Sequence, residues 1–136
     1  MSNLEQTLSI IKPDAVERNL IEEIKQEFKN KGFNILKEKK IKLEKSEAEK
    51  FYKVHQSKPF YNDLCSYLSS GPIVVMILER ESAVVENRKL MGATDPTKAE
   101  EGTLRKKYGI SIDKNSVHGS DSLDNAKIEI GFFFKD

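Results

Sequence analysis

The spacing of apolar side chains predicts strand, helix and strand in the first third of the chain. Residues 7–11 form a short apolar stretch that ends at a Lys-Pro pair, which predicts a first strand stopping there. Residues 20–28 carry apolar side chains at helical spacing, and Gly32 follows where a left-handed C-cap is typical. Residues 33–43 alternate in part between apolar and polar side chains, which predicts a second strand with a lysine-rich solvent side.

Two helical stripes in the middle of the chain predict a helical hairpin. Ser46 and Glu49 have capping-box spacing, and the helix that they open places Tyr52 and His55 on one face. A second stripe covers residues 60–68 and is closed by serines, a glycine and a proline. The short connection between the two stripes favours helices that lie side by side.

The remainder of the chain predicts a central strand, a helix, a long loop and a final strand and helix. The run from Ile73 to Leu78 is apolar and rich in β-branched residues, as in a strand covered on both faces. The next helix places Arg88 on an otherwise apolar stripe. Residues 92–102 keep no period and predict a loop, which compact domains mostly keep for function. Residues 116–118 look like a strand, and residues 123–130 like a short helix.

This order of elements predicts an α+β fold. We expect a ferredoxin-like βαββαβ sandwich with an antiparallel four-stranded sheet and an inserted helical hairpin. The chain has 136 residues, of which 38% are apolar and 33% charged, and this composition suits one globular core. We therefore expect a single domain over residues 1–136.

Charge and cysteine content narrow the class of protein. The chain has 23 basic and 22 acidic residues, so its formal net charge of +1 lacks the basic excess of a nucleic-acid wrapper. Cys65 is the single cysteine, which excludes an intramolecular disulfide and suits a reducing compartment, so we expect a cytoplasmic location. The longest apolar run is far shorter than the roughly 20 residues of a membrane span, so we expect no membrane association.

The most suggestive chemistry lies where His118 precedes Gly119, Ser120, Asp121 and Ser122. A small residue with hydroxyl and carboxylate groups beside an imidazole suits a nucleophile or a general acid–base. A histidine that ends a strand before a helix cap explains the same residues, and spacing alone leaves both interpretations open. The P-loop, dinucleotide-binding and zincin motifs are absent, which disfavours those three classes of site.

Six other residues are candidates for binding. Arg88 and Arg105 are scarce arginines in a lysine-rich chain, which suits bidentate recognition of oxyanions, although ordinary ion pairs explain them as well. The other candidates either line a pocket or have an ordinary structural place: Lys12, Tyr52, His55 and Phe60. Position alone favours a surface lysine and core aromatic side chains at these positions.

Six segments resemble, in order, the motifs of the nucleoside diphosphate kinase family. They are TLSIIKPDAV (7–16), FYKVHQSKPFY (51–61), SSGPIVVMIL (69–78), NRKLMGATDP (87–96), GTLR (102–105) and NSVHGSDS (115–122). Ordered agreement along nearly the whole chain makes chance similarity implausible. The resemblance implies a phosphotransferase that reversibly moves the terminal phosphate of a nucleoside triphosphate to a nucleoside diphosphate, by a ping-pong route through a phosphohistidine.

The resemblance also implies a role for each matching residue. His118 matches the family's nucleophile, and Ser120 and Glu129 match the residues that orient it. Lys12 and Tyr52 are expected to assist catalysis. The residues that resemble the phosphate- and ribose-binding set are Lys12, Tyr52, His55, Arg88, Thr94, Arg105 and Asn115.

The base, the metal ion and the assembly follow from the same resemblance. Phe60 looks like the stacking platform under the base, with Leu64 and Ile112 beside it, which implies broad base tolerance. Mg²⁺ is implied by the nucleotide substrate, and Asp121 is expected to touch it through water. The family is usually hexameric and sometimes tetrameric, and Pro96 matches a loop associated with subunit packing, so we expect a homo-oligomer.

Two alternatives and one local departure accompany this interpretation. A ferredoxin-like nucleic-acid-binding module is disfavoured by the charge balance and by the lack of an RNP-like segment. A catalytically inactive homologue is disfavoured because the matching site residues are present. Asn19 stands where glycine is common in the family, which puts the turn at that position in doubt.

Overall fold

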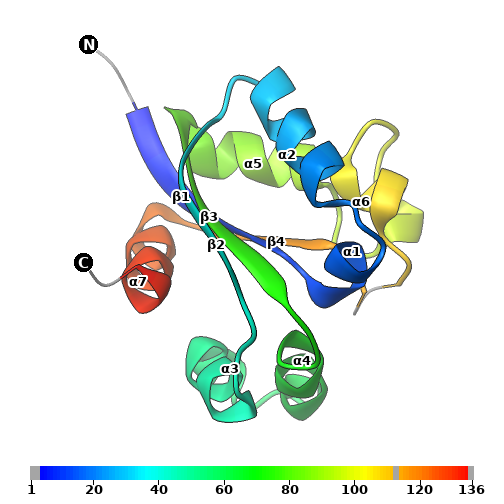
Figure 1. The fold of residues 1–136 in the computed structure, drawn as a ribbon, viewed down its shortest axis with the longest axis vertical. Helices are drawn as coiled ribbons and strands as arrows, with labels where there is room; N and C mark the ends of the chain where they lie inside the picture. Colours follow the sequence, from blue (N-terminus) through cyan, green and yellow to red (C-terminus); the bar gives the residue numbers. More distant parts are fainter. Residues whose placement is uncertain (1–3, 112–113, 135–136) are drawn as a thin grey trace.

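A computed structural model describes residues 4–111 and 114–134 of the chain (Figure 1). Within these ranges four strands form one antiparallel sheet, in the order β2-β3-β1-β4. The strands are β1 (Leu4–Ile11), β2 (Asn34–Ile41), β3 (Ile73–Glu81) and β4 (Val117–Gly119). The helical elements are α1 (Pro13–Glu17), α2 (Ile21–Asn30), α3 (Lys45–Phe51), η1 (Lys53–His55), α4 (Tyr61–Leu68), α5 (Ala83–Met91), η2 (Pro96–Lys98), α6 (Leu104–Tyr108) and α7 (Leu123–Phe133). The ferredoxin-like α+β fold expected from the sequence is confirmed.

The apolar run at 73–78 is a central strand, as predicted. β3 pairs with β1 along Leu4–Ile11 and with β2 on its other side. Side chains of successive β3 residues point to opposite faces of the sheet. Val74 and Met76 accordingly join one buried cluster, and Ile73 and Val75 join the other.

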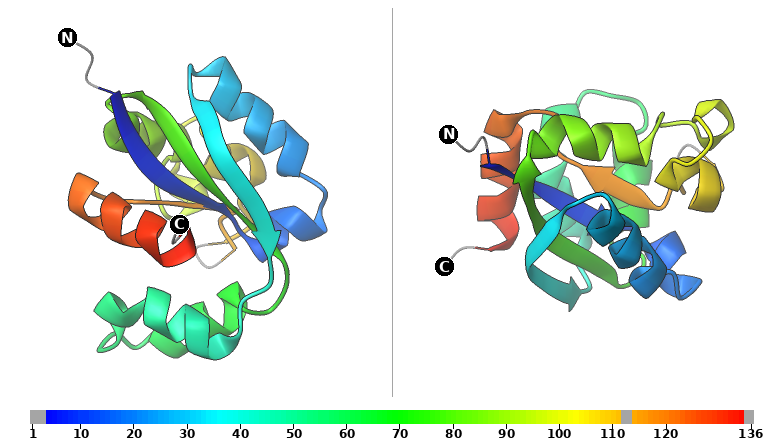
Figure 2. Two further views of the ribbon diagram at one scale, coloured as in Figure 1. Left: turned by 60° about the vertical axis from the view of Figure 1, so that its left-hand side comes forward. Right: turned by 90° about the horizontal axis from the view of Figure 1, so that it is seen from above.

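Helices cover both faces of the sheet (Figures 1 and 2). The first apolar cluster joins one face to helices α1, α2, α5 and α6. The second joins the opposite face to α3, α4 and α7. The hairpin of α3 and α4 extends from the end of the sheet where β2 leaves it and β3 begins (Figure 2). β1 is therefore buried between two layers, and its end at Ile11 delivers Lys12 to the interior.

The predicted helix start at Ser46 is wrong by two residues. The N-cap of α3 is Glu44, whose backbone N–H donates to the Glu47 carboxylate at 3.0 Å. The chain holds two overlapping pairs at capping-box spacing, and the one that begins directly after the buried Leu43 forms the box. The helix also ends earlier than predicted, so His55 lies in the short helix η1 rather than in α3.

Two turns near the N-terminus have left-handed backbone conformations. Gly32 has φ +84°, as its predicted place after a helix requires. Asn19 has φ +61° in the turn between α1 and α2. Asparagine tolerates this region better than other non-glycine residues, so the departure from glycine at Asn19 keeps the turn. Helix α1 itself was missed because five residues are too few to show a period.

Among the helices that the structure describes, none is long and apolar enough to cross a membrane.

Candidate active site

His118 lies in the middle of the short strand β4, opposite Ile10 of β1. Its Nε2 is 3.2 Å from Oε1 of Glu129, which projects from α7. Ser120 is fully buried and donates from its hydroxyl to the same carboxylate oxygen at 2.7 Å. His118 and Ser120 of the HGSDS segment thus share one partner, the carboxylate of Glu129, nine residues beyond Ser120.

The turn after β4 explains why Glu129 returns to His118. Ser122 is the N-cap of α7, and its hydroxyl accepts from the backbone N–H of Asn125 at 3.1 Å. The helix that starts there runs back across the sheet and contacts β1. The separation of Glu129 from Ser122 is two turns of helix, which sets the carboxylate over the imidazole.

Gly119 permits a close approach between β4 and α5. A Cβ atom at this position would lie 2.3 Å from Nδ2 of Asn87 and 2.8 Å from Cε of Met91. Asn87 is fully buried, and within the described residues its amide has no hydrogen-bond partner. The apolar stripe predicted from the sequence included Arg88, so its neighbour Asn87 was not a candidate.

An aromatic wall extends from His118 toward the helical hairpin. The Phe51 and Tyr52 rings lie 5.3 and 6.4 Å from the imidazole, both edge-on. The Tyr52 ring is in turn 6.1 Å from that of His55, which is 6.3 Å from Phe60. Burial and the nearby Glu129 carboxylate raise the pKa of Tyr52 well above its usual range, so the phenol keeps its proton.

Phe51 was not a candidate from the sequence, although it is the aromatic ring nearest to His118 of those in this wall. Its signal was available, because it directly precedes Tyr52 in the FYKVH segment. Phe60 is 45% exposed, as a ring offered to a planar ligand has to be. Leu64 is half-buried beside the second apolar cluster and lies on α4, which begins directly after Phe60.

Lys12 occupies a buried position at the end of β1, although position alone favoured a surface lysine. Lys12 is 5% exposed, and its Nζ donates to Oδ1 of Asn115 at 2.9 Å. The Asn115 amide donates onward to the Thr94 carbonyl at 3.1 Å. Three predicted binding residues from distant parts of the chain are therefore linked in one row.

Arg105 is held by two backbone carbonyls. Its guanidinium donates to Gly92 and to Val117, each at 3.0 Å, and Val117 directly precedes His118. Burial, with the nearby positive charge of Arg88, lowers the pKa of Arg105 to about 10. A partly buried Arg105 with a second positive charge nearby favours a bound anion.

Arg88 is exposed, so its predicted place on the buried stripe of α5 is wrong. Asn87 and Leu90 occupy the buried face instead, because the helix rotates by about 100° per residue. The solvent-facing side chain of Arg88, close to Arg105, remains suited to binding an oxyanion.

The remaining predicted residues lie at the edge of this arrangement or outside the described ranges. Asp121 is exposed, and its Oδ1 accepts from the side-chain amide of Asn125. Thr94 is exposed as well, in the loop before η2. Ile112 lies outside the described residues.

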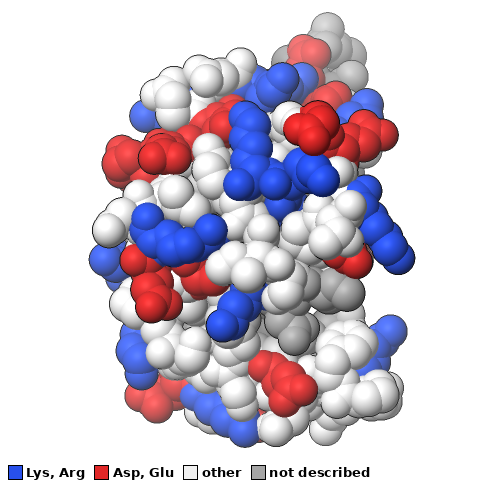
Figure 3. Space-filling model, turned by 90° about the vertical axis from the view of Figure 1, so that its right-hand side faces the viewer, with Lys and Arg blue, Asp and Glu red and all other residues white. Residues whose placement is uncertain are grey.

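Charges on one face of the molecule are mixed rather than separated (Figure 3). On the face drawn in Figure 3, lysine and arginine side chains lie beside aspartates and glutamates. This matches the formal net charge of +1. The candidate site therefore attracts anions through its own few cations rather than through a broad basic surface.

Comparisons with known proteins agree with one another. The family profile described as nucleoside diphosphate kinase matches residues 5–136. The chain is 57% identical over 131 residues to a nucleoside diphosphate kinase of Nitratiruptor sp. and 56% identical over 131 residues to that of Geobacter sulfurreducens, covering 96% of each chain in both cases.

Solved structures give the same answer at lower identity. The nucleoside diphosphate kinase of Aquifex aeolicus superposes with a TM-score of 0.94 at 37% identity, covering 96% of this chain and 95% of that one. The enzyme from Encephalitozoon cuniculi also superposes with a TM-score of 0.94, at 38% identity, covering 97% and 90% of the two chains. The sequence motifs, the fold and these matches converge, and the chain belongs to the nucleoside diphosphate kinase family.

Proposed function

We propose that this protein is a nucleoside diphosphate kinase that transfers the γ-phosphate of a nucleoside triphosphate to a nucleoside diphosphate through a phosphohistidine on His118. The observation that carries the proposal is the contact between His118 Nε2 and the Glu129 carboxylate at 3.2 Å. A carboxylate at Nε2 favours the tautomer with its proton there, which leaves the lone pair on Nδ1. Nδ1 is therefore the attacking atom.

The first half-reaction forms one bond and breaks one. The Nδ1 lone pair attacks the γ-phosphorus, the bond from that phosphorus to the bridging oxygen breaks, and the nucleoside diphosphate leaves with the electron pair. The ring becomes cationic while Nε2 keeps its proton, and the Glu129 carboxylate stabilises that charge. Ser120 keeps the carboxylate in place by donating to it at 2.7 Å. The second half-reaction is the reverse with another nucleoside diphosphate.

Positioning and charge supply most of the catalysis in phosphoryl transfer. We assign the phosphates to Lys12, Arg88 and Arg105, whose positive charges offset the charge that builds up on the transferring group. Asn115 holds Lys12 by accepting from its Nζ, and Asn115 is itself held by donating to the Thr94 carbonyl.

The aromatic wall from His118 to Phe60 offers binding positions for the base and the ribose of the nucleotide. We assign the base to Phe60 and Leu64, to which the resemblance adds Ile112, outside the described residues. We assign the ribose and the phosphate chain to the side of the wall that leads from His55 past Tyr52 to His118. Stacking on an exposed ring distinguishes bases poorly, because every base has a π-face. Several nucleotides should therefore serve as substrates.

We propose that Mg²⁺ comes with the nucleotide. Within the ranges that the structure describes, no group of three or more histidine, cysteine or carboxylate side chains could hold a metal ion. The residues fit an ion held mainly by phosphate oxygens, with Asp121 contacting it through water. Such an ion neutralises phosphate charge when bound, and it requires no further protein ligand.

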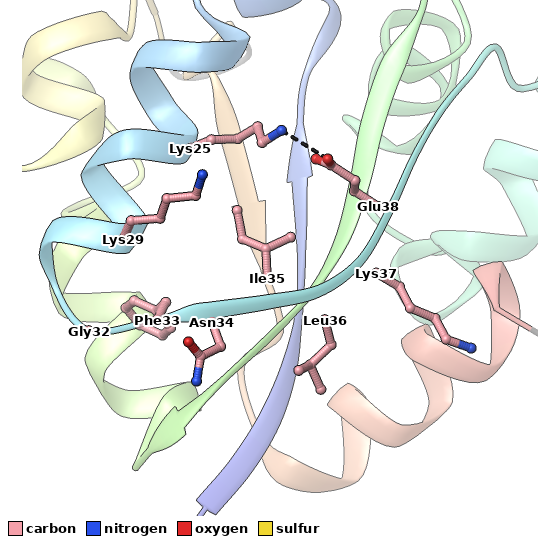
Figure 4. A pocket seen from close by; sticks show the side chains of 9 residues that line it. All are labelled: Lys25, Lys29, Gly32, Phe33, Asn34, Ile35, Leu36, Lys37 and Glu38. Carbon is pink, nitrogen blue, oxygen red and sulfur yellow. Dashed lines mark hydrogen bonds and ion pairs between the residues drawn. The ribbon is translucent and has the colours of Figure 1, made fainter.

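We propose that the chain associates with copies of itself, as a hexamer or a tetramer. β2 is an edge strand of the sheet, and Leu36 on it is 44% exposed. A hollow of about 520 Å³ lies between β2 and α2, spanned by an ion pair of 2.9 Å between Lys25 and Glu38 (Figure 4). An unpaired strand edge with an exposed apolar residue suits a second β2. Pro96, in the loop that the resemblance connects with packing, is buried at the start of η2.

Light scattering tests this assembly. Leu36→Lys should give a smaller particle than the wild type. Val85→Lys is the matched control, because Val85 is an apolar residue on α5 that is 54% exposed. An unchanged mass for Leu36→Lys would exclude the β2 edge as an interface.

Two further expectations belong to this proposal. The site draws residues from β1, β4, α5, α6, α7 and the helical hairpin, which supports one domain over residues 1–136. We also propose a cytoplasmic location, because Cys65 is a buried free thiol and suits a reducing compartment.

A labelling experiment tests the activity. The protein is mixed with γ-labelled ATP and Mg²⁺ without an acceptor, and unlabelled GDP is then added. Acid-labile, alkali-stable label should appear on the protein and move to GTP. His118→Ala should take up no label, whereas His55→Ala, which changes the other histidine, should still be labelled. Label on His118→Ala would refute the mechanism, and an unlabelled wild type that still binds nucleotide would favour the inactive homologue.

A further inference from the structure

Asp14 is a buried carboxylate next to the candidate site that the proposed mechanism does not use. It lies in α1, two residues after Lys12, and is 6% exposed. Its Oδ2 accepts from the Arg18 guanidinium and from the Ser116 hydroxyl, each at 3.0 Å. Its Oδ1 accepts from the Tyr67 hydroxyl. A buried charge with this many partners is held in one position.

The partners of Asp14 come from separate elements. Tyr67 belongs to α4, and its hydroxyl also accepts the backbone N–H of Asp14 at 2.8 Å. Arg18 follows α1 and donates as well to the Ser116 hydroxyl at 3.1 Å and to the Tyr108 carbonyl at 2.6 Å. The carboxylate therefore joins α1 and α4 to the chain segment that enters β4.

That segment contains an unusual turn. Ser116 has φ +76°, and the backbone N–H of Val117 donates to the Asn115 carbonyl at 3.0 Å. A bond between residues two apart, around a central φ near +75°, defines the rare and strained form of the γ-turn. A serine adopts it only where its surroundings hold it there. The Ser116 hydroxyl donates to Asp14 and accepts from Arg18, and these two bonds hold its side chain in place.

The turn sets the geometry of three groups assigned to the reaction. Asn115 lies on one side of Ser116 and accepts from Lys12 Nζ. His118 lies two residues beyond it on β4. The Ser116 carbonyl accepts the backbone N–H of Lys12 at 2.8 Å, which ties the end of β1 to the same turn. A change in the Ser116 backbone would therefore move Lys12 and Asn115 relative to His118.

We propose that Asp14 is a positioning residue, which holds Ser116 in the γ-turn and thereby fixes His118 against Lys12 and Asn115. This inference rests on the proposed function, because the three positioned groups are those assigned to phosphoryl transfer. Both carboxylate oxygens of Asp14 are hydrogen-bonded within the protein, so Asp14 acts through Ser116. Its effect is on the rate of the chemical step rather than on base binding, which Phe60 provides elsewhere.

Single-turnover labelling with γ-labelled ATP separates positioning from mere stability. The rate constant of phosphoenzyme formation reports the geometry of each folded molecule, whereas the amplitude reports the folded fraction. Asp14→Asn should lower the rate constant about 10- to 100-fold at saturating ATP, since misplacement near 1 Å has an effect of that size. Ile24→Val, a buried change in α2, is the stability control and should lower only the amplitude or thermal stability.

A rescue variant tests the link through Ser116. Glycine takes a positive φ without help, so Ser116→Gly in the Asp14→Asn background should recover much of the rate constant. Ser116→Ala, which removes the hydroxyl and keeps the Cβ, should behave like Asp14→Asn. A wild-type rate constant in Asp14→Asn overturns the proposal, and so does a failure of Ser116→Gly to rescue it. A wild-type protein that takes no label overturns the proposed function instead.

Discussion

Replacing Gly119 by alanine should disturb the nucleophile through its neighbour. The new methyl group would lie 2.3 Å from Nδ2 of Asn87 and 2.8 Å from Cε of Met91. Ordinary contact begins near 3.4 Å, so the side chains of Asn87 and Met91, or β4 and α5 themselves, must shift by about 1 Å. Because His118 directly precedes Gly119, a shift of that size should slow phosphoenzyme formation by up to about 100-fold. The overpacking should also cost about 1–3 kcal/mol of unfolding free energy.

Single-turnover labelling and urea unfolding measure the two effects of Gly119→Ala. Adding Asn87→Ala should restore part of both, since it removes the nearest obstacle and the flexible Met91 side chain can yield. Asn87→Ala alone is the control for loss of the buried amide. If Gly119→Ala labels at the wild-type rate and unfolds at the wild-type urea concentration, the close packing of β4 on α5 does not position His118, and the reasoning fails.

Three further predictions concern the base, alkaline pH and a turn. Phe60→Ala should weaken ATP and GTP binding to a similar extent in equilibrium titrations, and a loss confined to one base would contradict the platform. Burial and the Glu27 carboxylate raise the pKa of Tyr108 to about 12. The contribution of this shift to stability is complete below pH 10 and is lost as pH rises toward 12. The free energy of unfolding, measured with urea, should therefore fall less for Tyr108→Phe than for the wild type over that window. In thermal melts, Asn19→Val should cost about 1–2 kcal/mol and Asn19→Gly little, because φ is +61° there.

The fold was predictable where burial imposes a period on the sequence. β3 is covered on both faces along residues 73–78, and its sequence there is accordingly an unbroken apolar run. Helix α2 has an apolar stripe that ends at Gly32. Short elements carry no such record. Helix α1 has five residues, and its buried side chains read as loop because Pro13 opens it. The two overlapping capping-box patterns at the start of α3 differ only in their tertiary surroundings, which a local pattern does not contain.

The candidate site was predictable as a set of residues but not as a set of contacts. The HGSDS segment made His118 and Ser120 candidates, the resemblance added Glu129, and the structure links the three by hydrogen-bonding distances. The burial of Lys12 depends on layers formed by remote helices, which its own sequence neighbourhood does not show. Asn87 was missed for a related reason: the rotation of α5 that buries it, and exposes Arg88, is fixed by the sheet beneath.

The pairing of β1 with β4 has a consequence for synthesis of the protein. Ser9 lies opposite Gly119, so this pairing joins positions about 110 residues apart, and closing such a loop costs about 2 kcal/mol more than closing one of ten. Because the ribosome makes the chain from its N-terminus, β1 and β3 can form while the strand bearing His118 is still unmade. A chain that stops before residue 117 therefore has an open β1 edge, prone to aggregation, and no nucleophile.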